Sequence, residues 1–177
     1  MQLSARRSIC GAGLVLLFAA GTASAQQFKQ LAEVCDASLA RSGTERIAAC
    51  TQLIESQTLS PHDASLAYLH RSWPYSMVGQ YDLAIVDLNE AARLDPQSAI
   101  ILSDRGFARL RMGQTDQAIA DYSAALRLNP RTVYALYGRG LAALRKGDRA
   151  GGIADLDAAR SLDPKVDGVF AALGFRP

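Results

Sequence analysis

Few residues of this chain belong to the types that most often carry catalysis or bind metal ions. The 177 residues include two histidines, His62 and His70, and three cysteines, too few for a zinc ribbon or a three-histidine metal site. Neither histidine stands at a recognisable spacing from both a nucleophile and a carboxylate. The sequence also lacks an HExxH pair, a CxxC pair and a glycine-rich phosphate loop that follows a strand. These observations predict a protein that is not an enzyme and that uses neither a cofactor nor a metal ion.

Two of the cysteines, Cys35 and Cys50, are placed to form a disulfide. Residues 28–40 and 45–56 each read as a helix, and the turn between them contains Gly43. The midpoint between the two cysteines falls on this turn, and residues equidistant from the turn of a helical hairpin lie opposite one another. The alternative is a pair of buried thiols that pack as small apolar groups.

The first 25 residues have the pattern of an export signal. Arg6 and Arg7 precede an uncharged apolar run over residues 9–20, and small residues, Ala23 and Ala25, mark a cleavage site before residue 26. The run is shorter than the roughly 20 residues that cross a bilayer, so no stable membrane insertion is expected after cleavage. The alternatives are an uncleaved anchor and a buried helix. We expect an exported protein, in a Gram-negative periplasm or secreted, where a disulfide can form.

Charge is balanced overall but unevenly distributed. Two of the 19 Lys and Arg side chains lie in the signal, so 17 basic residues remain beside 17 acidic ones. This balance argues against a nucleic-acid binder. Residues 26–96 carry a net charge of −4 and residues 97–177 a net charge of +4. This difference in charge between the two halves can orient a partner or a second copy of the chain, so a homo-oligomer is a possible state. The alternative is that the charges are only solvated at the surface and orient nothing.

A period of 34 residues organises the sequence from residue 65 onward. The same residue type recurs at this spacing in five classes: Pro96, Pro130 and Pro164; Gly79, Gly113 and Gly147; Ala91, Ala125 and Ala159; Arg71, Arg105 and Arg139; Asp87, Asp121 and Asp155. Each unit reads as a helical hairpin, with helix A over 65–78 and helix B over 81–94 in the first. The glycine permits the turn between the two helices, and the proline ends helix B. Within each hairpin the repeated arginine and aspartate are expected to lie side by side.

These residues resemble the tetratricopeptide repeat, whose 34-residue pattern combines small residues at helix contacts with a closing proline. The sequence departs from that pattern where arginine replaces leucine at position 7 of all three units, and where Ser72 and Gly152 replace glycine and alanine. The resemblance implies an all-α fold, a right-handed α-solenoid of helix-turn-helix repeats. We assign residues 1–25 to the signal, 26–64 to a disulfide-linked helical hairpin, 65–98, 99–132 and 133–166 to three repeats, and 167–177 to a C-terminal cap. Nine helices are expected in all.

Stacked hairpins place every helix A on the concave wall of a solenoid. One stripe of helix A packs on its own helix B, and a second stripe is predicted to face the concave space. The second stripe comprises Leu66, Leu69, Trp73 and Met77 in the first unit, Ile100, Ser103, Phe107, Leu110 and Arg111 in the second, and Tyr134, Tyr137, Leu141, Leu144 and Arg145 in the third. An exposed apolar strip of this kind is typical of a protein or peptide partner site. The alternative is that the N-terminal hairpin, the cap or a second copy fills the space.

The predicted function is a non-enzymatic adaptor that binds a partner segment in this groove. In the family's best-known mode, Lys and Asn at positions 2, 5, 6 and 9 hold a terminal carboxylate. This chain has none of them there and has Asp104 at position 6, so apolar or helix-in-groove recognition is expected. Two further hypotheses are a self-assembling envelope protein and a carrier of a small apolar ligand.

Overall fold

The computed structural model describes residues 25–36 and 42–175, and these residues form helices joined by short turns. The predicted signal peptide lies outside the described residues, apart from its last residue. The helices are one over residues 25–35, α2 (Gly43–Glu55), α3 (Pro61–Met77), α4 (Tyr81–Leu94), α5 (Ala99–Arg111), α6 (Thr115–Leu128), α7 (Val133–Arg145), α8 (Arg149–Leu162) and α9 (Val166–Ala172). The nine helices found in this part of the chain agree with the predicted number.

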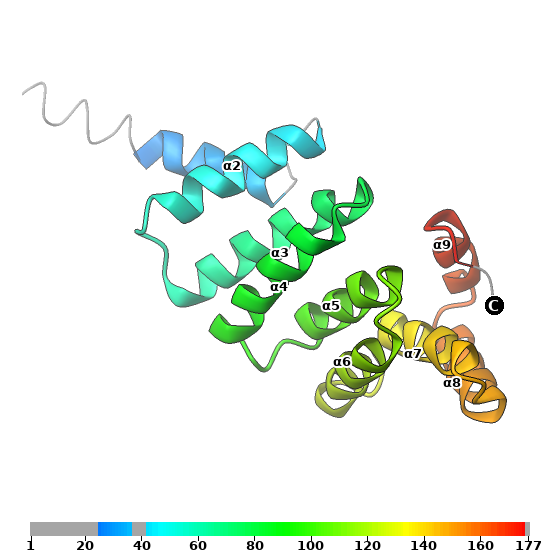
Figure 1. Cartoon of the computed structure of the whole chain (residues 1–177). Coiled ribbons are helices and arrows are strands. Elements are labelled where there is room, and N and C mark those ends of the chain that lie inside the picture. Colours follow the sequence, from blue (N-terminus) through cyan, green and yellow to red (C-terminus); the bar gives the residue numbers. More distant parts are fainter. Residues whose placement is uncertain (1–24, 37–41, 176–177) are drawn as a thin grey trace, which may run out of the picture.

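Successive hairpins stack into the predicted α-solenoid (Figure 1). The α3/α4, α5/α6 and α7/α8 pairs are the three repeats. Each of the first two packs against the next hairpin along the chain, and the third packs against α9. Helix α3 begins four residues before the predicted residue 65. The reason is local: the Ser60 hydroxyl accepts a hydrogen bond from the Asp63 amide at 3.1 Å, and Pro61 occupies the first helical position, where its fixed φ suits the helix and its missing N–H costs nothing.

The turn inside each repeat needs its glycine. Gly79, Gly113 and Gly147 have φ values of 80°, 75° and 88°, in the left-handed region that glycine enters without steric cost. The residue after each glycine donates its amide back to the preceding helix, as Gln80 does to the Tyr75 carbonyl at 2.9 Å. This bond satisfies a carbonyl that the helix end leaves free. The predicted hairpin turns are therefore confirmed.

The predicted disulfide is also confirmed. Cys35 and Cys50 are bonded, with their Cα atoms 4.8 Å apart. Both cysteines are buried in a small cluster with Ala49, Leu53 and Ala67, which joins the first hairpin to α3. Closure of this loop stabilises the fold by about 3 kcal/mol in the chain-entropy model.

The repeated arginine and aspartate form an ion pair across each hairpin, as predicted. In each repeat the guanidinium makes two hydrogen bonds to one carboxylate, and the shorter bonds of Arg71–Asp87, Arg105–Asp121 and Arg139–Asp155 are all 2.7 Å. The first two arginines also reach the preceding hairpin. Arg71 donates to the Thr51 hydroxyl at 2.9 Å, and Arg105 donates to the Asn89 side chain at 3.1 Å. The pairs therefore fix the register within a hairpin and the contact to its neighbour.

Candidate functional site

An apolar pocket with a volume of about 650 Å³ opens among α3, α5, α7 and α9, and we call it the central pocket. Its lining consists of Trp73, Ile100, Ser103, Asp104, Phe107, Tyr122, Tyr134, Val169, Phe170, Ala172 and Leu173. Pockets of this size bind small ligands or a few side chains of a partner. The central pocket is thus the part of the predicted concave groove that stays open.

Five of the predicted groove residues line the central pocket: Trp73, Ile100, Ser103, Phe107 and Tyr134. Three of them keep a large exposed fraction, 41% for Trp73, 61% for Ile100 and 50% for Tyr134. These three side chains come from three different repeats. The open part of the groove therefore offers two aromatic rings and one aliphatic side chain to an incoming molecule.

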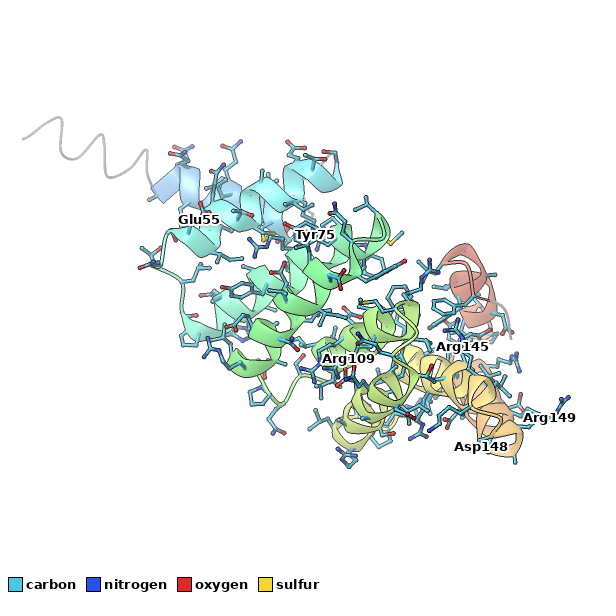
Figure 2. All side chains as sticks on the ribbon, viewed as in Figure 1. Glu55, Tyr75, Arg109, Arg145, Asp148 and Arg149 are labelled. Atoms are coloured by element: carbon cyan, nitrogen blue, oxygen red, sulfur yellow. A yellow bond between two sulfur atoms is a disulfide. The ribbon has the colours of Figure 1, made fainter. Side chains whose placement is uncertain are left out.

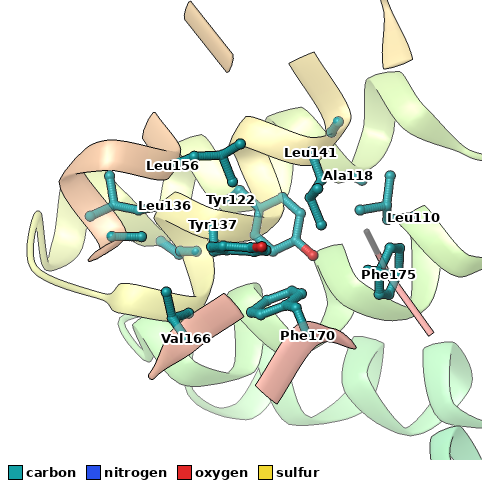
Figure 3. Packing of buried hydrophobic residues seen from close by; sticks show 14 of the residues in the cluster. Leu110, Ala118, Tyr122, Leu136, Tyr137, Leu141, Leu156, Val166, Phe170 and Phe175 are labelled. Atoms are coloured by element: carbon teal, nitrogen blue, oxygen red, sulfur yellow. The ribbon is translucent and has the colours of Figure 1, made fainter. Parts of the chain in front are cut away.

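The C-terminal part of the predicted groove is covered by the chain itself. Tyr137, Leu141 and Leu110 were expected to face the concave space, but all three are buried in a cluster with Phe170 and Phe175 (Figure 3). The Tyr137 ring lies 4.3 Å from the Phe170 ring, centre to centre. This corrects the prediction for these three residues, and the stated alternative, a cap that fills part of the space, holds here.

Polar bonds attach the cap to the repeats. The Tyr137 hydroxyl donates to the Asp167 carboxylate at 2.6 Å, and Arg160 on α8 binds the same carboxylate with a closest distance of 2.9 Å. Burial and the Asp167 bond raise the pKa of Tyr137 to about 12. The Arg160 and Tyr137 bonds lower the pKa of Asp167. The orientation of α9, which forms one wall of the central pocket, is therefore set by both charge and ring packing.

Two further predicted groove residues, Arg111 and Arg145, hold the end of the chain in place. Arg111 donates to the Leu173 carbonyl at 2.7 Å, and its guanidinium lies 5.2 Å from the centre of the Phe175 ring. Arg145, at the C-terminal end of α7 and labelled in Figure 2, donates to the Leu110 carbonyl at 2.9 Å and lies 5.5 Å from the centre of the same ring. Neither arginine lines the central pocket.

The remaining four predicted residues lie outside the central pocket. Leu144 packs against the cluster beneath the cap, and Leu69 packs against the core of the first repeat. Leu66 lines a second pocket of about 420 Å³ beside the disulfide. Met77 is 52% exposed at the end of α3. The structure therefore brings only part of the predicted stripe into one site.

Two polar side chains line the central pocket and were not predicted as site residues. The Asp104 carboxyl has no hydrogen bond or ion pair among the described residues, and burial raises its pKa to about 7. The Tyr122 hydroxyl is buried and has no hydrogen-bond partner there. Asp104 is also the one acidic or basic side chain among the residues of the lining. The charge that the lining can carry is therefore negative, and it is present when Asp104 is ionised.

Tyr122 reaches the pocket because two glycines leave room for its ring. A Cβ atom on Gly138 would lie 2.3 Å from the Tyr122 Cζ, and one on Gly106 would lie 2.9 Å from the same ring. The two glycines on neighbouring helices are a feature of the sequence that could have indicated this close approach. They do not indicate which hydroxyl ends inside the groove.

Among residues 25–36 and 42–175, no helix is long and apolar enough to cross a membrane. Within those ranges there is also no cluster of three His, Cys, Asp or Glu side chains arranged to hold a metal ion.

Comparison with known proteins identifies the repeats. Residues 103–167 match the family described as tetratricopeptide repeat, and residues 78–113 match the family described as TPR repeat, so the two matches together run from residue 78 to residue 167. Proteins of this kind are in general non-catalytic scaffolds. No curated protein sequence matches the chain.

Solved structures with the same fold include three that are informative. The crystal structure of MamA superposes with a TM-score of 0.67 at 20% identity and covers 81% of this chain and 82% of its own. The first TPR domain of Spaghetti (RPAP3), bound to the HSP90 peptide SRMEEVD, gives 0.57 at 23% identity and covers 58% of this chain and 82% of its own. YrrB, described as a TPR protein with an unusual peptide-binding site, gives 0.59 at 18% identity and covers 69% of this chain and 61% of its own. The chain therefore belongs to the tetratricopeptide repeat family.

Proposed function

We propose that this protein is an exported, non-enzymatic adaptor that binds a segment of a partner protein at the central pocket. The observation that carries the proposal is the pocket itself, an apolar cavity whose rim exposes Trp73, Ile100 and Tyr134. Large exposed aromatic side chains beside a pocket are the groups that most often dominate the free energy of binding at protein interfaces. The proposal is supported by two solved structures of the same fold, Spaghetti bound to an HSP90 peptide and YrrB with a peptide-binding site.

Export is supported by two features of the chain. The basic and apolar pattern of residues 1–25 fits a signal peptide. The Cys35–Cys50 disulfide fits an oxidising compartment, such as a periplasm or the cell exterior. A partner is therefore to be sought outside the cytoplasm.

The partner segment is expected to bind through apolar contacts and not through its terminal carboxylate. The family's carboxylate-binding Lys and Asn are missing from the matching positions, and the charged group in the pocket is the acidic side chain of Asp104. A second negative charge placed beside Asp104 in an apolar pocket would be repelled and poorly solvated.

Affinity capture from the periplasmic extract of the source cell tests the proposal. The mature chain is compared with Trp73→Ala/Tyr134→Ala, which removes two exposed rim rings, and with Val86→Ala/Ile153→Ala, which removes two exposed side chains on the outer helices α4 and α8. We expect the rim variant to retain at most about a tenth of the partner, since loss of an anchoring ring costs about 2 kcal/mol or more. The outer variant should capture as much partner as the wild type. Equal capture by all three proteins would exclude the central pocket as the binding site.

A further inference from the structure

The polar groups of the central pocket indicate what kind of side chain it accepts. Asp104 on α5 and Tyr122 on α6 both line the pocket, and no hydrogen bond joins them in the described part of the chain. The Tyr122 hydroxyl is buried without a partner, whereas Asp104 is half-buried and pairs with no described side chain. The Tyr122 side chain is 1% exposed. A buried hydroxyl without a hydrogen bond is destabilising, so a ligand that supplies a partner for Tyr122 and a counter-charge for Asp104 would gain free energy at both groups.

Basic residues on the neighbouring helices are engaged in other ion pairs and contacts. Arg145 acts on the Tyr122 hydroxyl electrostatically, but it donates to the Leu110 carbonyl and stacks on Phe175. Arg105 and Arg109 bind Asp121 at 2.7 Å each. No described basic side chain lines the pocket with Asp104. Among the described residues the carboxylate therefore has no counter-charge, and a cation from a bound partner can supply one.

The walls of the pocket limit the shape of that cation. Apart from Asp104, Ser103 and the phenol hydroxyls, its lining is apolar, with Phe107, Tyr134 and Phe170 among the rings. A compact hydrated ion would lose its water in such a lining without replacement. The ligand must therefore carry a positive charge and also offer apolar surface to the lining. A lysine or arginine side chain does both, because its methylene stem packs on apolar surface while its head carries the charge.

We propose that the central pocket binds a basic side chain of the partner segment, with the aliphatic stem among the aromatic rings and the cationic head between the Asp104 carboxylate and the Tyr122 hydroxyl. This inference rests on the proposed function and names the chemistry of the partner. The ammonium or guanidinium donates to both oxygens and so supplies the two missing hydrogen bonds.

Three probes with one carbon skeleton test the inference: 4-phenylbutylamine, 4-phenylbutanol and 4-phenylbutyrate, which are cationic, neutral and anionic. Binding is followed by the fluorescence of Trp73, which lines the pocket and is the one tryptophan of the sequence. At pH 8 we expect the amine to bind the wild type at least about tenfold more tightly than the alcohol, and the carboxylate to bind most weakly.

Two variants assign the selectivity to the named groups. Asp104→Asn, which keeps the shape of the side chain, is expected to abolish the preference for the amine while the affinity for the alcohol changes less than about twofold. Tyr122→Phe, which removes only the unpartnered hydroxyl, is expected to weaken amine binding by about threefold. Val86→Ala on α4 should leave all three affinities unchanged.

Results of the probe experiment that differ from these expectations would overturn the inference. A preference for the amine that persists in Asp104→Asn, equal binding of the three probes, or no binding of the amine would each exclude a cation site at Asp104. The capture experiment on the rim variant is independent of these results, so the adaptor function can stand when the cation site fails. Native mass spectrometry can detect a small amine that co-purifies with the wild type and is lost in Asp104→Asn. Such an amine would show that the pocket binds a free small molecule and not a side chain of a partner protein.

Discussion

Replacement of Arg71 by alanine is expected to lower the free energy of unfolding by about 3 kcal/mol. Arg71 makes two hydrogen bonds to Asp87, at 2.9 and 2.7 Å, and a third to Thr51. Asp87 is 2% exposed, so the variant leaves a carboxylate buried without its counter-charge. Chemical denaturation followed by circular dichroism gives the change as a shift of the midpoint at constant slope.

Arg105→Ala is the matched control for this prediction. It removes the same bidentate pair one repeat later, but Arg109 remains 2.7 Å from the Asp121 carboxylate. The loss is therefore expected to be smaller, about 1–2 kcal/mol. Equal losses for Arg71→Ala and Arg105→Ala would show that Arg109 does not compensate at Asp121. A loss below about 0.5 kcal/mol for Arg71→Ala would show that the pairs do not hold the hairpins in register.

Asp104→Asn is expected to stabilise the protein at pH 8 by about 2–4 kcal/mol. Burial raises the pKa of Asp104 from 3.8 to about 7, so between these pH values the folded chain binds more protons at this site than the unfolded chain does. The contribution of the protonated carboxyl to stability is therefore fully present below pH 4 and is lost as the pH rises through 7. Asparagine does not ionise, so the stability of the variant does not fall at this site as the pH rises through 7.

Unfolding free energies of both proteins at pH 5 and pH 8 measure this effect. The gain in the variant should be larger at pH 8 than at pH 5. The exposed Asp157, whose side chain is 63% accessible and pairs with Arg160 at 3.0 Å, is the comparison, and Asp157→Asn should not stabilise the protein at pH 8. A gain at Asp104 that does not depend on pH would mean that the carboxyl is well solvated. The same measurement shows that Asp104→Asn is folded, so its expected loss of amine binding is not a loss of structure.

The repeats were predictable from the sequence because each of their features is local. The turn at Gly79 requires a positive φ within one residue, and Pro96 ends the helix that precedes it. The Arg71–Asp87 pair follows from two residues that are equidistant from that turn. Cys35 and Cys50 follow the same geometry in the first hairpin. All of these features form within a single hairpin, so none of the predictions depends on how the hairpins stack.

The shape of the groove was not predictable in the same way. The helix α9 was expected as a cap on the last repeat, and Phe170 does pack on Tyr137 there. The chain then continues to Phe175, whose ring lies 5.7 Å from that of Phe107 in the preceding repeat. This contact depends on packing between segments far apart in the sequence, which the 34-residue period does not encode.

Asp104 illustrates the same limit for the site itself. Its position in the repeat argued against carboxylate recognition, and that argument used the sequence alone. The raised pKa of Asp104 comes from burial, and the pocket around it is formed by side chains of α7 and α9 as well as of its own helix. The sequence shows the position of Asp104 in the repeat. Only the folded structure shows that no described basic side chain lines the pocket beside it.

Site-specific photo-crosslinking tests the central claim most directly. A benzoylphenylalanine is placed at Ile100, on the rim of the central pocket, or at Val86, on the outer helix α4; the two side chains are 61% and 60% exposed. The account predicts that the Ile100 position yields a covalent adduct with the partner and that the Val86 position yields none. An adduct from Val86 in the absence of one from Ile100 would contradict it.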